Sequence, residues 1–173
     1  MAGYSEVINV IGAMIIFSMI LLTANSMMLR NTTMQIEGEL EQEVISLGQE
    51  IIEEALNKSF DEVVSHDNAV PPSLIPGGFT SPDELGPDGI ETNREDFNDF
   101  DDYNGWSGTF ETSHGTFELR AEVFYVDENS FEEINQQSTF KKIVVYITSE
   151  YLTNNAGEEI EYQLEFIRNY YAD

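Results

Sequence analysis

An acidic stretch from residue 96 to residue 104 carries the side chains best suited to binding a metal ion. Ca²⁺ prefers about six to eight oxygen ligands, which carboxylates and amide carbonyls supply. The stretch departs from the EF-hand pattern because, with Gly105 as the glycine of that pattern, Phe100 would stand at a ligand position. The alternative is a solvated acidic turn whose tight geometry comes from Asn104 and Gly105. The candidate Ca²⁺ ligands are Asp96, Asp99, Asp101 and Asp102, with Asn98 and Asn104 beside them.

The residues that support catalysis in other proteins form no recognised catalytic pattern in this sequence. His66 and His114 lie in unrelated segments and lack the HExxH spacing of metalloproteases. Ser107 lacks the GxSxG frame that exposes a nucleophile. The chain has no phosphate-binding glycine motif and no cysteine. Paired carboxylates are expected by chance among 33 acidic residues. We therefore expect a protein that is not an enzyme and that needs no cofactor beyond the Ca²⁺ considered above.

The charge balance argues against nucleic acid as a partner. The 173 residues include 33 Asp and Glu but only 7 Lys and Arg, so the formal net charge is −26. A protein that holds a phosphate backbone or docks on an anionic membrane surface needs a basic patch. Hydrophobic residues make up 41% of the chain, which is enough for a folded core and excludes a disordered acidic tail. Such acidity suits a surface that faces cations or high salt.

The elements that position these residues begin with an apolar segment. Residues 7–29 carry no charge between Glu6 and Arg30. A helix of this length spans roughly 34 Å, close to the hydrocarbon core of about 30 Å. A cleaved signal peptide is the alternative, but it normally has a basic residue ahead of a shorter apolar run, and no Lys or Arg precedes this one. Residues 1–30 are therefore predicted to form a retained transmembrane helix.

A second helical pattern follows without interruption over residues 31–64. Apolar residues recur at spacings of three and four, and glutamates occupy much of the remaining surface. No proline precedes Pro71, so residues 5–64 are predicted to form one helix of roughly 90 Å. The amphipathic half is expected to pack its stripe on its own domain. That stripe comprises Ile36, Leu40, Val44, Leu47, Ile51, Ala55, Phe60 and Val63.

Strand patterns dominate the C-terminal third of the chain. Apolar residues alternate with polar ones over residues 116–126 and 159–167, and residues 140–148 hold an apolar run. Residues 153–157 suit a hairpin between the last two strands. Because all five prolines lie between residues 71 and 87, residues 65–115 are expected to be a loop region. The predicted fold class is α+β, with the long N-terminal helix packed on an antiparallel sheet of three or four strands over residues 116–173.

Glu6 is the charged residue at the start of the apolar run. A carboxylate drawn into hydrocarbon costs several kcal/mol unless it is protonated or paired. The α-amino group of a neighbouring chain could reach it, whereas its own N-terminus cannot fold back within a helix. The alternative is that Glu6 lies in the aqueous interface, where its negative charge favours the helix dipole.

With Ala2 taken as the mature first residue, the segment from Ala2 to Leu22 resembles the N-terminal segment of type IV pilins and pseudopilins. Those segments begin at a small or aromatic residue, carry a Glu four residues later and continue as an apolar helix. Residues 96–108 more weakly resemble an acidic loop of some minor pilin-like proteins. The resemblance implies that Glu6 neutralises the α-amine of Ala2 in an adjacent subunit, so that both residues direct subunit assembly. The implied filament-core residues are Val7, Ile8, Val10, Ile11, Ile15, Ile16, Phe17, Leu21 and Leu22.

The expected function is therefore structural, as a subunit of an extracellular type IV pilus-like filament. The apolar helix would reside in the inner membrane before assembly and among neighbouring helices afterwards. The resemblance implies identical subunits, a platform protein with its ATPase and a prepilin peptidase as partners. The alternative is a single-pass membrane-anchored binding module with an acidic extracytoplasmic head.

Overall fold

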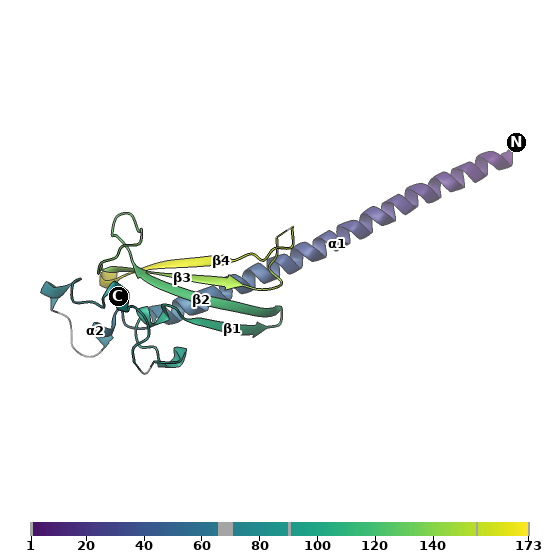
Figure 1. The fold of residues 1–173 in the computed structure, drawn as a ribbon. Coiled ribbons are helices and arrows are strands. Elements are labelled where there is room, and N and C mark those ends of the chain that lie inside the picture. Colours follow the sequence, from purple (N-terminus) through teal and green to yellow (C-terminus); the bar gives the residue numbers. More distant parts are fainter. Residues whose placement is uncertain (1, 66–70, 90, 155, 173) are drawn as a thin grey trace. The chain divides into compact units, whose positions relative to one another are not determined.

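The computed structural model describes residues 2–65, 71–89, 91–154 and 156–172. The chain divides into two compact units, residues 1–42 and residues 43–173. Helix α1 (Ala2–Leu56) begins in the first unit and ends in the second (Figure 1). The helical elements that follow it are α2 (Glu62–Ser65) and the short 3₁₀ helices η1 (Pro72–Leu74), η2 (Pro82–Glu84), η3 (Arg94–Asp96), η4 (Asp101–Tyr103) and η5 (Tyr170–Ala172).

The first unit is the amino-terminal part of α1, which carries no charge from Val7 to Leu29. Four of its hydroxyl groups form hydrogen bonds inside the helix. The hydroxyls of Ser18 and Thr23 donate to the carbonyl oxygens four residues earlier, at 2.8 and 2.9 Å, and Thr32 and Thr33 do the same. Because these four hydroxyl groups donate to the helix backbone, they do not need water as a partner. The outward surface of the helix around them is therefore mainly apolar.

The second unit contains a four-stranded antiparallel sheet in the order β1-β2-β3-β4 (Figure 1). The strands are β1 (Ser107–Thr112), β2 (Gly115–Tyr125), β3 (Phe140–Thr148) and β4 (Tyr162–Asn169). In β2 the inward residues Phe117, Leu119 and Ala121 are buried, whereas Glu118 and Arg120 between them are exposed. This alternation sets the register, because a slip by one residue would expose every apolar side chain of the strand.

The end of α1 that lies in the second unit packs on this sheet. Val44, Ile51 and Ala55 of the predicted stripe are completely buried. Gly48 lets the helix approach the sheet closely, since a Cβ atom there would lie 2.9 Å from Leu164 Cδ2 and 3.2 Å from Ile147 Cδ1. The predicted α+β class, with a helix packed on an antiparallel sheet, is confirmed.

Helix α1 ends at Leu56, earlier than the predicted boundary at residue 64. The side chain of Asn57 donates to the carbonyl oxygen of Glu53 at 2.8 Å, and Arg168 donates to the carbonyl oxygens of Lys58 and Ser59. Because the chain leaves the helix here, the side chain of Phe60 packs in a cluster with Phe79 and Tyr170. Their ring centroids lie 5.2 and 5.4 Å from that of Phe60. Tertiary partners of the segment after Leu56 therefore outweigh the helical periodicity of the sequence.

The predicted loop region at residues 65–115 contains strand β1, so the expectation of loop structure was wrong at residues 107–112. This strand is at most half-buried along its length, so its apolar alternation is weak. It pairs with β2 through a tight connection in which Thr112 faces Gly115. Strand β4 begins at Tyr162, after the predicted start at 159, because Glu159 forms an isolated bridge with Thr153.

Candidate functional site

The predicted filament-core residues form an uncovered apolar surface on the first unit. Each of them is more than half exposed in the described chain, with Leu22 at 69% and Ile11 at 52%. This helix is long and apolar enough to cross a membrane, and its most apolar stretch is not buried by the described residues. Exposed apolar surface of this extent indicates a site that meets lipid or another protein.

Glu6 lies on the same helix, about one turn after its first residue. Its side chain is exposed. Ala2 is the first residue of α1, and its side chain lies outside the described residues. The two predicted assembly residues therefore stand on consecutive turns at the amino-terminal end of the apolar surface.

The acidic loop is organised by its own backbone amides. Asp99 Oδ1 accepts hydrogen bonds from the backbone N–H groups of Asp101 and Asp102, with N···O distances of 2.8 and 3.2 Å. Asp102 Oδ2 accepts those of Asn98 and Asp99, at 2.7 and 3.0 Å. These interlocked turns lead into η4 and bury all three aspartates. Asp96 instead lies in η3, exposed, where it accepts a hydrogen bond from Asn93.

A buried lysine meets this loop from the sheet. Lys141 of β3 has no exposed surface, and its ammonium contacts Asp101 Oδ1. The same Nζ lies 2.8 Å from Asp61 Oδ2 and 2.9 Å from the carbonyl oxygen of Phe60. Sequence reasoning missed Lys141. The sequence did contain a signal for this residue. Lys141 lies two positions before Ile143 on β3, so both side chains point to the same, buried face of the sheet.

Burial changes the protonation of the acidic loop. It raises the pKa of Asp99 to about 9, with the nearby charge of Asp101 acting in the same direction and that of Lys141 against it. Burial also raises the pKa of Asp101, which Lys141 opposes, and that of Asp102. Asp99 therefore carries a proton at neutral pH, which lessens the negative charge around the lysine.

The predicted Ca²⁺ ligands are thus only partly brought together. Asp99, Asp101 and Asp102 are buried together, whereas Asp96 is exposed in η3 and bonds to Asn93. Backbone amides and Lys141 already bond to carboxylate oxygens that a metal ion would need. Within the described ranges, no group of three or more His, Asp or Glu is arranged to hold a metal ion. The ammonium of Lys141 supplies the positive charge at this loop.

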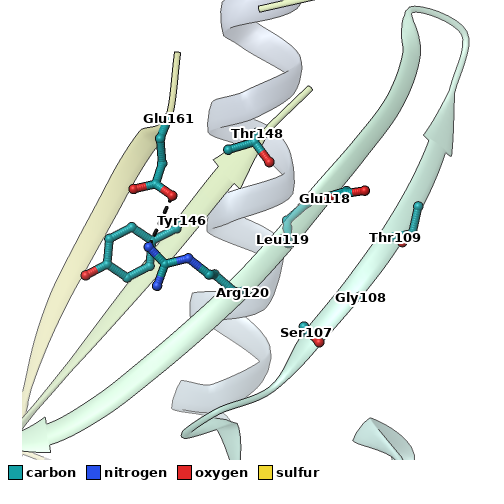
Figure 2. Close-up of a pocket in the computed structure, with 9 residues that line it drawn as sticks. All are labelled: Ser107, Gly108, Thr109, Glu118, Leu119, Arg120, Tyr146, Thr148 and Glu161. Carbon is teal, nitrogen blue, oxygen red and sulfur yellow. Dashed lines mark hydrogen bonds and ion pairs between the residues drawn. The ribbon is translucent and has the colours of Figure 1, made fainter. Parts of the chain in front are cut away.

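A shallow hollow lies on the face of the sheet that the side chain of Arg120 occupies (Figure 2). The guanidinium of Arg120 stacks over the ring of Tyr146, 3.5 Å from its centroid. It also pairs with Glu122 at 2.7 Å and with Glu161 at 3.1 Å. Ser107 lies at the edge of this hollow. Because two carboxylates neutralise the guanidinium, the arrangement links β2, β3 and the segment before β4.

His114 is not part of the acidic loop or of the hollow at Arg120. His114 lies in the β1–β2 turn, with its Nδ1 3.5 Å from Glu43 Oε2. His66 lies outside the described residues.

No protein-family model, curated protein or solved structure matches this chain. The function of the chain is therefore inferred from its own chemistry, above all from the uncovered apolar surface of α1 with Glu6 at its end.

Proposed function

We propose that this chain is a structural subunit of a type IV pilus-like filament, built by packing of the apolar part of α1 against copies of itself. The observation that carries the proposal is the uncovered apolar surface from Val7 to Leu22, on a chain whose second unit has its own packed core. A chain of this kind needs a hydrophobic environment for one unit and water for the other.

The energetic reason is the cost of leaving this surface in water. Burying one large apolar side chain contributes about 1.5–3 kcal/mol, so the filament-core residues together strongly favour an apolar environment. Before assembly, lipid supplies that environment. After assembly, neighbouring helices supply it, and the chain leaves the membrane for the cell surface without exposing the helix to water.

Glu6 then gives the packing its axial register. A carboxylate inside a bundle of apolar helices is stable only when it is paired, and the α-amino group of an adjacent subunit provides a partner of opposite charge. A subunit shifted along the axis would leave both charges unpaired, so the pair selects one arrangement among many that bury similar apolar area.

The second unit would form the outside of the filament. The chain's excess of acidic residues is compatible with side-by-side packing only when counterions screen the repulsion between neighbours. The partners in this proposal are identical subunits, a platform protein with its ATPase and a prepilin peptidase. Nucleic acid is not among them.

The test compares Glu6→Leu with Glu37→Leu, a matched removal of an exposed acid farther along α1. Both variants and the wild type are expressed with their assembly machinery, and sheared surface material is examined by immunolabelled electron microscopy. Membrane fractionation measures insertion separately.

We expect labelled fibres from the wild type and Glu37→Leu, and none from Glu6→Leu, although all three chains insert in the membrane. Wild-type label confined to membrane fragments would contradict the filament and support the membrane-anchored binding module. Fibres of normal yield from Glu6→Leu would contradict the role of Glu6.

A further inference from the structure

Lys141 is a nucleophile held against carboxyl groups in a site without solvent. Its side chain and that of Asp61 have no exposed surface, and that of Asp101 is 3% exposed. Aromatic rings line the pocket, with Nζ 4.8 Å from the ring centroid of Phe60 and 5.2 Å from that of Tyr125. An amine and a carboxyl group held in contact away from water are the reactants of amide formation.

We propose that Lys141 and Asp101 join in an intramolecular isopeptide bond. The Nζ–Cγ bond forms, one Cγ–O bond of Asp101 breaks, and the departing oxygen leaves as water. The nitrogen loses two protons, and these are the two that the water carries away. Nothing is oxidised or reduced, and the reaction needs no cofactor or co-reactant.

Asp101 is the better electrophile because Asp61 is held as a hydrogen-bonded carboxylate. The oxygens of Asp61 accept the backbone N–H and the hydroxyl of Thr80, the N–H of Val63 and the hydroxyl of Tyr125, at 3.1–3.3 Å. Such donors stabilise negative charge and disfavour attack at that carboxyl carbon. Among the described residues, the Asp101 carboxylate has a smaller set of donors, the ammonium of Lys141 and the side chain of Asp99.

The neighbouring acids can move the protons. Asp61 Oδ2, 2.8 Å from Nζ, is placed to accept a proton from the ammonium and so release the free amine. Asp99 shares a side-chain hydrogen bond with Asp101, and it is the acid that keeps its proton. It can polarise the Asp101 carboxyl group and protonate the departing oxygen. The proton that Asp61 accepts passes on to the departing oxygen, and the second proton of the nitrogen replaces the one that Asp99 gave, so both acids end the reaction in the states in which they began.

Burial favours the amide over the ion pair. Taking two charges out of water carries a large desolvation cost, and the amide removes both charges. Lys141 and Asp101 are also held in contact by the folded chain, which supplies the high effective concentration that an uncatalysed amide synthesis lacks. Exclusion of water from the pocket disfavours the reverse hydrolysis.

The bond would tie the loop that begins η4 to strand β3, across 40 residues of sequence. It does not depend on the proposed filament, although a subunit that bears tension would gain resistance to unfolding from it. Absence of the isopeptide bond is detected by mass spectrometry, whereas absence of filament assembly is detected by electron microscopy.

The test is the intact mass of the full-length folded protein, purified in detergent and then denatured for mass spectrometry. We expect the wild type to be lighter than its sequence by one water molecule, with a branched peptide that joins residues 101 and 141. Lys141→Arg should have the full sequence mass, because arginine cannot form this bond. Lys142→Arg is the matched control, since Lys142 pairs with Glu165 on the other side of the strand, and it should retain the bond.

Asp101→Asn gives an independent test of the chemistry. Attack on an asparagine amide releases ammonia in place of water, so this variant should reach the same final mass as the cross-linked wild type. A wild-type protein of full sequence mass would overturn the proposal, whether or not any variant folds. A branch at residue 61 would overturn the assignment of Asp101.

Discussion

Nζ of Lys141 and Oδ2 of Asp61 lie 2.8 Å apart, and neither side chain has any exposed surface. The two residues are separated by 80 positions in the sequence, so this contact joins the segment between α1 and α2 to strand β3. In the ion-paired state each of these buried charges is compensated by the other, so removal of one partner is expected to destabilise the second unit.

Lys141→Met is expected to destabilise the second unit by about 3–5 kcal/mol, because it leaves buried carboxyl groups without their cation. If the isopeptide bond is present, the lysine carries no charge, and the variant instead loses a 40-residue closed loop. By analogy with a disulfide, such a loop contributes on the order of 4 kcal/mol. Urea unfolding followed by Trp106 fluorescence, in the full chain in detergent, measures the change.

The neighbouring lysine provides the control for this measurement. Lys142→Met removes a pair with Glu165, which is 65% exposed, so the expected change is at most about 1 kcal/mol. Equal losses from the two lysine variants would show that burial of Lys141 has no special role.

Stability should fall as the pH rises from about 4 towards 9. The pKa of Asp99 is raised by burial to about 9, above its ordinary value of 3.8, so the folded state keeps a proton that the unfolded chain releases. Its stabilising contribution is complete below the unfolded pKa and is lost as pH rises through the folded pKa, by up to about 1.4 kcal/mol per unit. Thermal unfolding across this pH range measures the slope.

Asp99→Asn isolates the contribution of this one group. The amide cannot ionise, yet its oxygen can still accept the N–H groups of Asp101 and Asp102. The variant should show a smaller fall in stability with pH than the wild type, whereas the repulsion from the remaining acids is unchanged. Parallel pH profiles for the two proteins would rule out a protonated Asp99.

Gly48→Val should destabilise the packing of α1 on the sheet by about 1–3 kcal/mol, because the added atoms overlap Leu164 and Ile147. Gly38→Val is the comparison, since a Cβ atom at that glycine meets nothing within 4 Å and the expected change is within about 0.5 kcal/mol. Unfolding midpoints of the two variants in detergent measure the difference. Equal midpoints would contradict a close approach at Gly48.

Arg120→Ala should loosen the outer face of the sheet without unfolding it. The side chain stacks on Tyr146 and pairs with Glu122 and Glu161, but it is 45% exposed, so the expected loss is about 1 kcal/mol. Hydrogen exchange should rise in β4 and the segment before it. Unchanged exchange there would mean that the arginine does not link these strands.

If the chain forms the proposed filament, the filament yield should rise with salt concentration when the assembly machinery is held constant. With a formal net charge of −26 on each chain, repulsion between neighbouring heads is strong at low ionic strength and is screened within about 10 Å at 0.1 M salt. Counting fibres by electron microscopy over a series of NaCl concentrations measures this. A yield that falls with salt would contradict charge repulsion as the limiting factor.

The sequence alone determined the features that depend on near neighbours in the chain. The uncharged and mostly apolar run after Glu6 specifies a helix without a charged face, and the alternation around Phe117 and Ile143 specifies strands with one buried face. These patterns follow from the periods of helix and strand, so the α+β class was predictable without coordinates. The filament assignment has no such test and stays a proposal.

Only the tertiary structure decided which distant residues meet. No local period indicates that Asp61 and Asp101 share Lys141, that α1 stops at Leu56, or that residues 107–112 pair with β2. These outcomes depend on contacts between segments 40 or more residues apart, or on a weakly apolar edge strand that forms because its neighbour is present. The physical reason is that apolar side chains are stabilised only when distant segments pack together and exclude water. A sequence pattern indicates which face of an element is apolar, but not which other segment will cover that face.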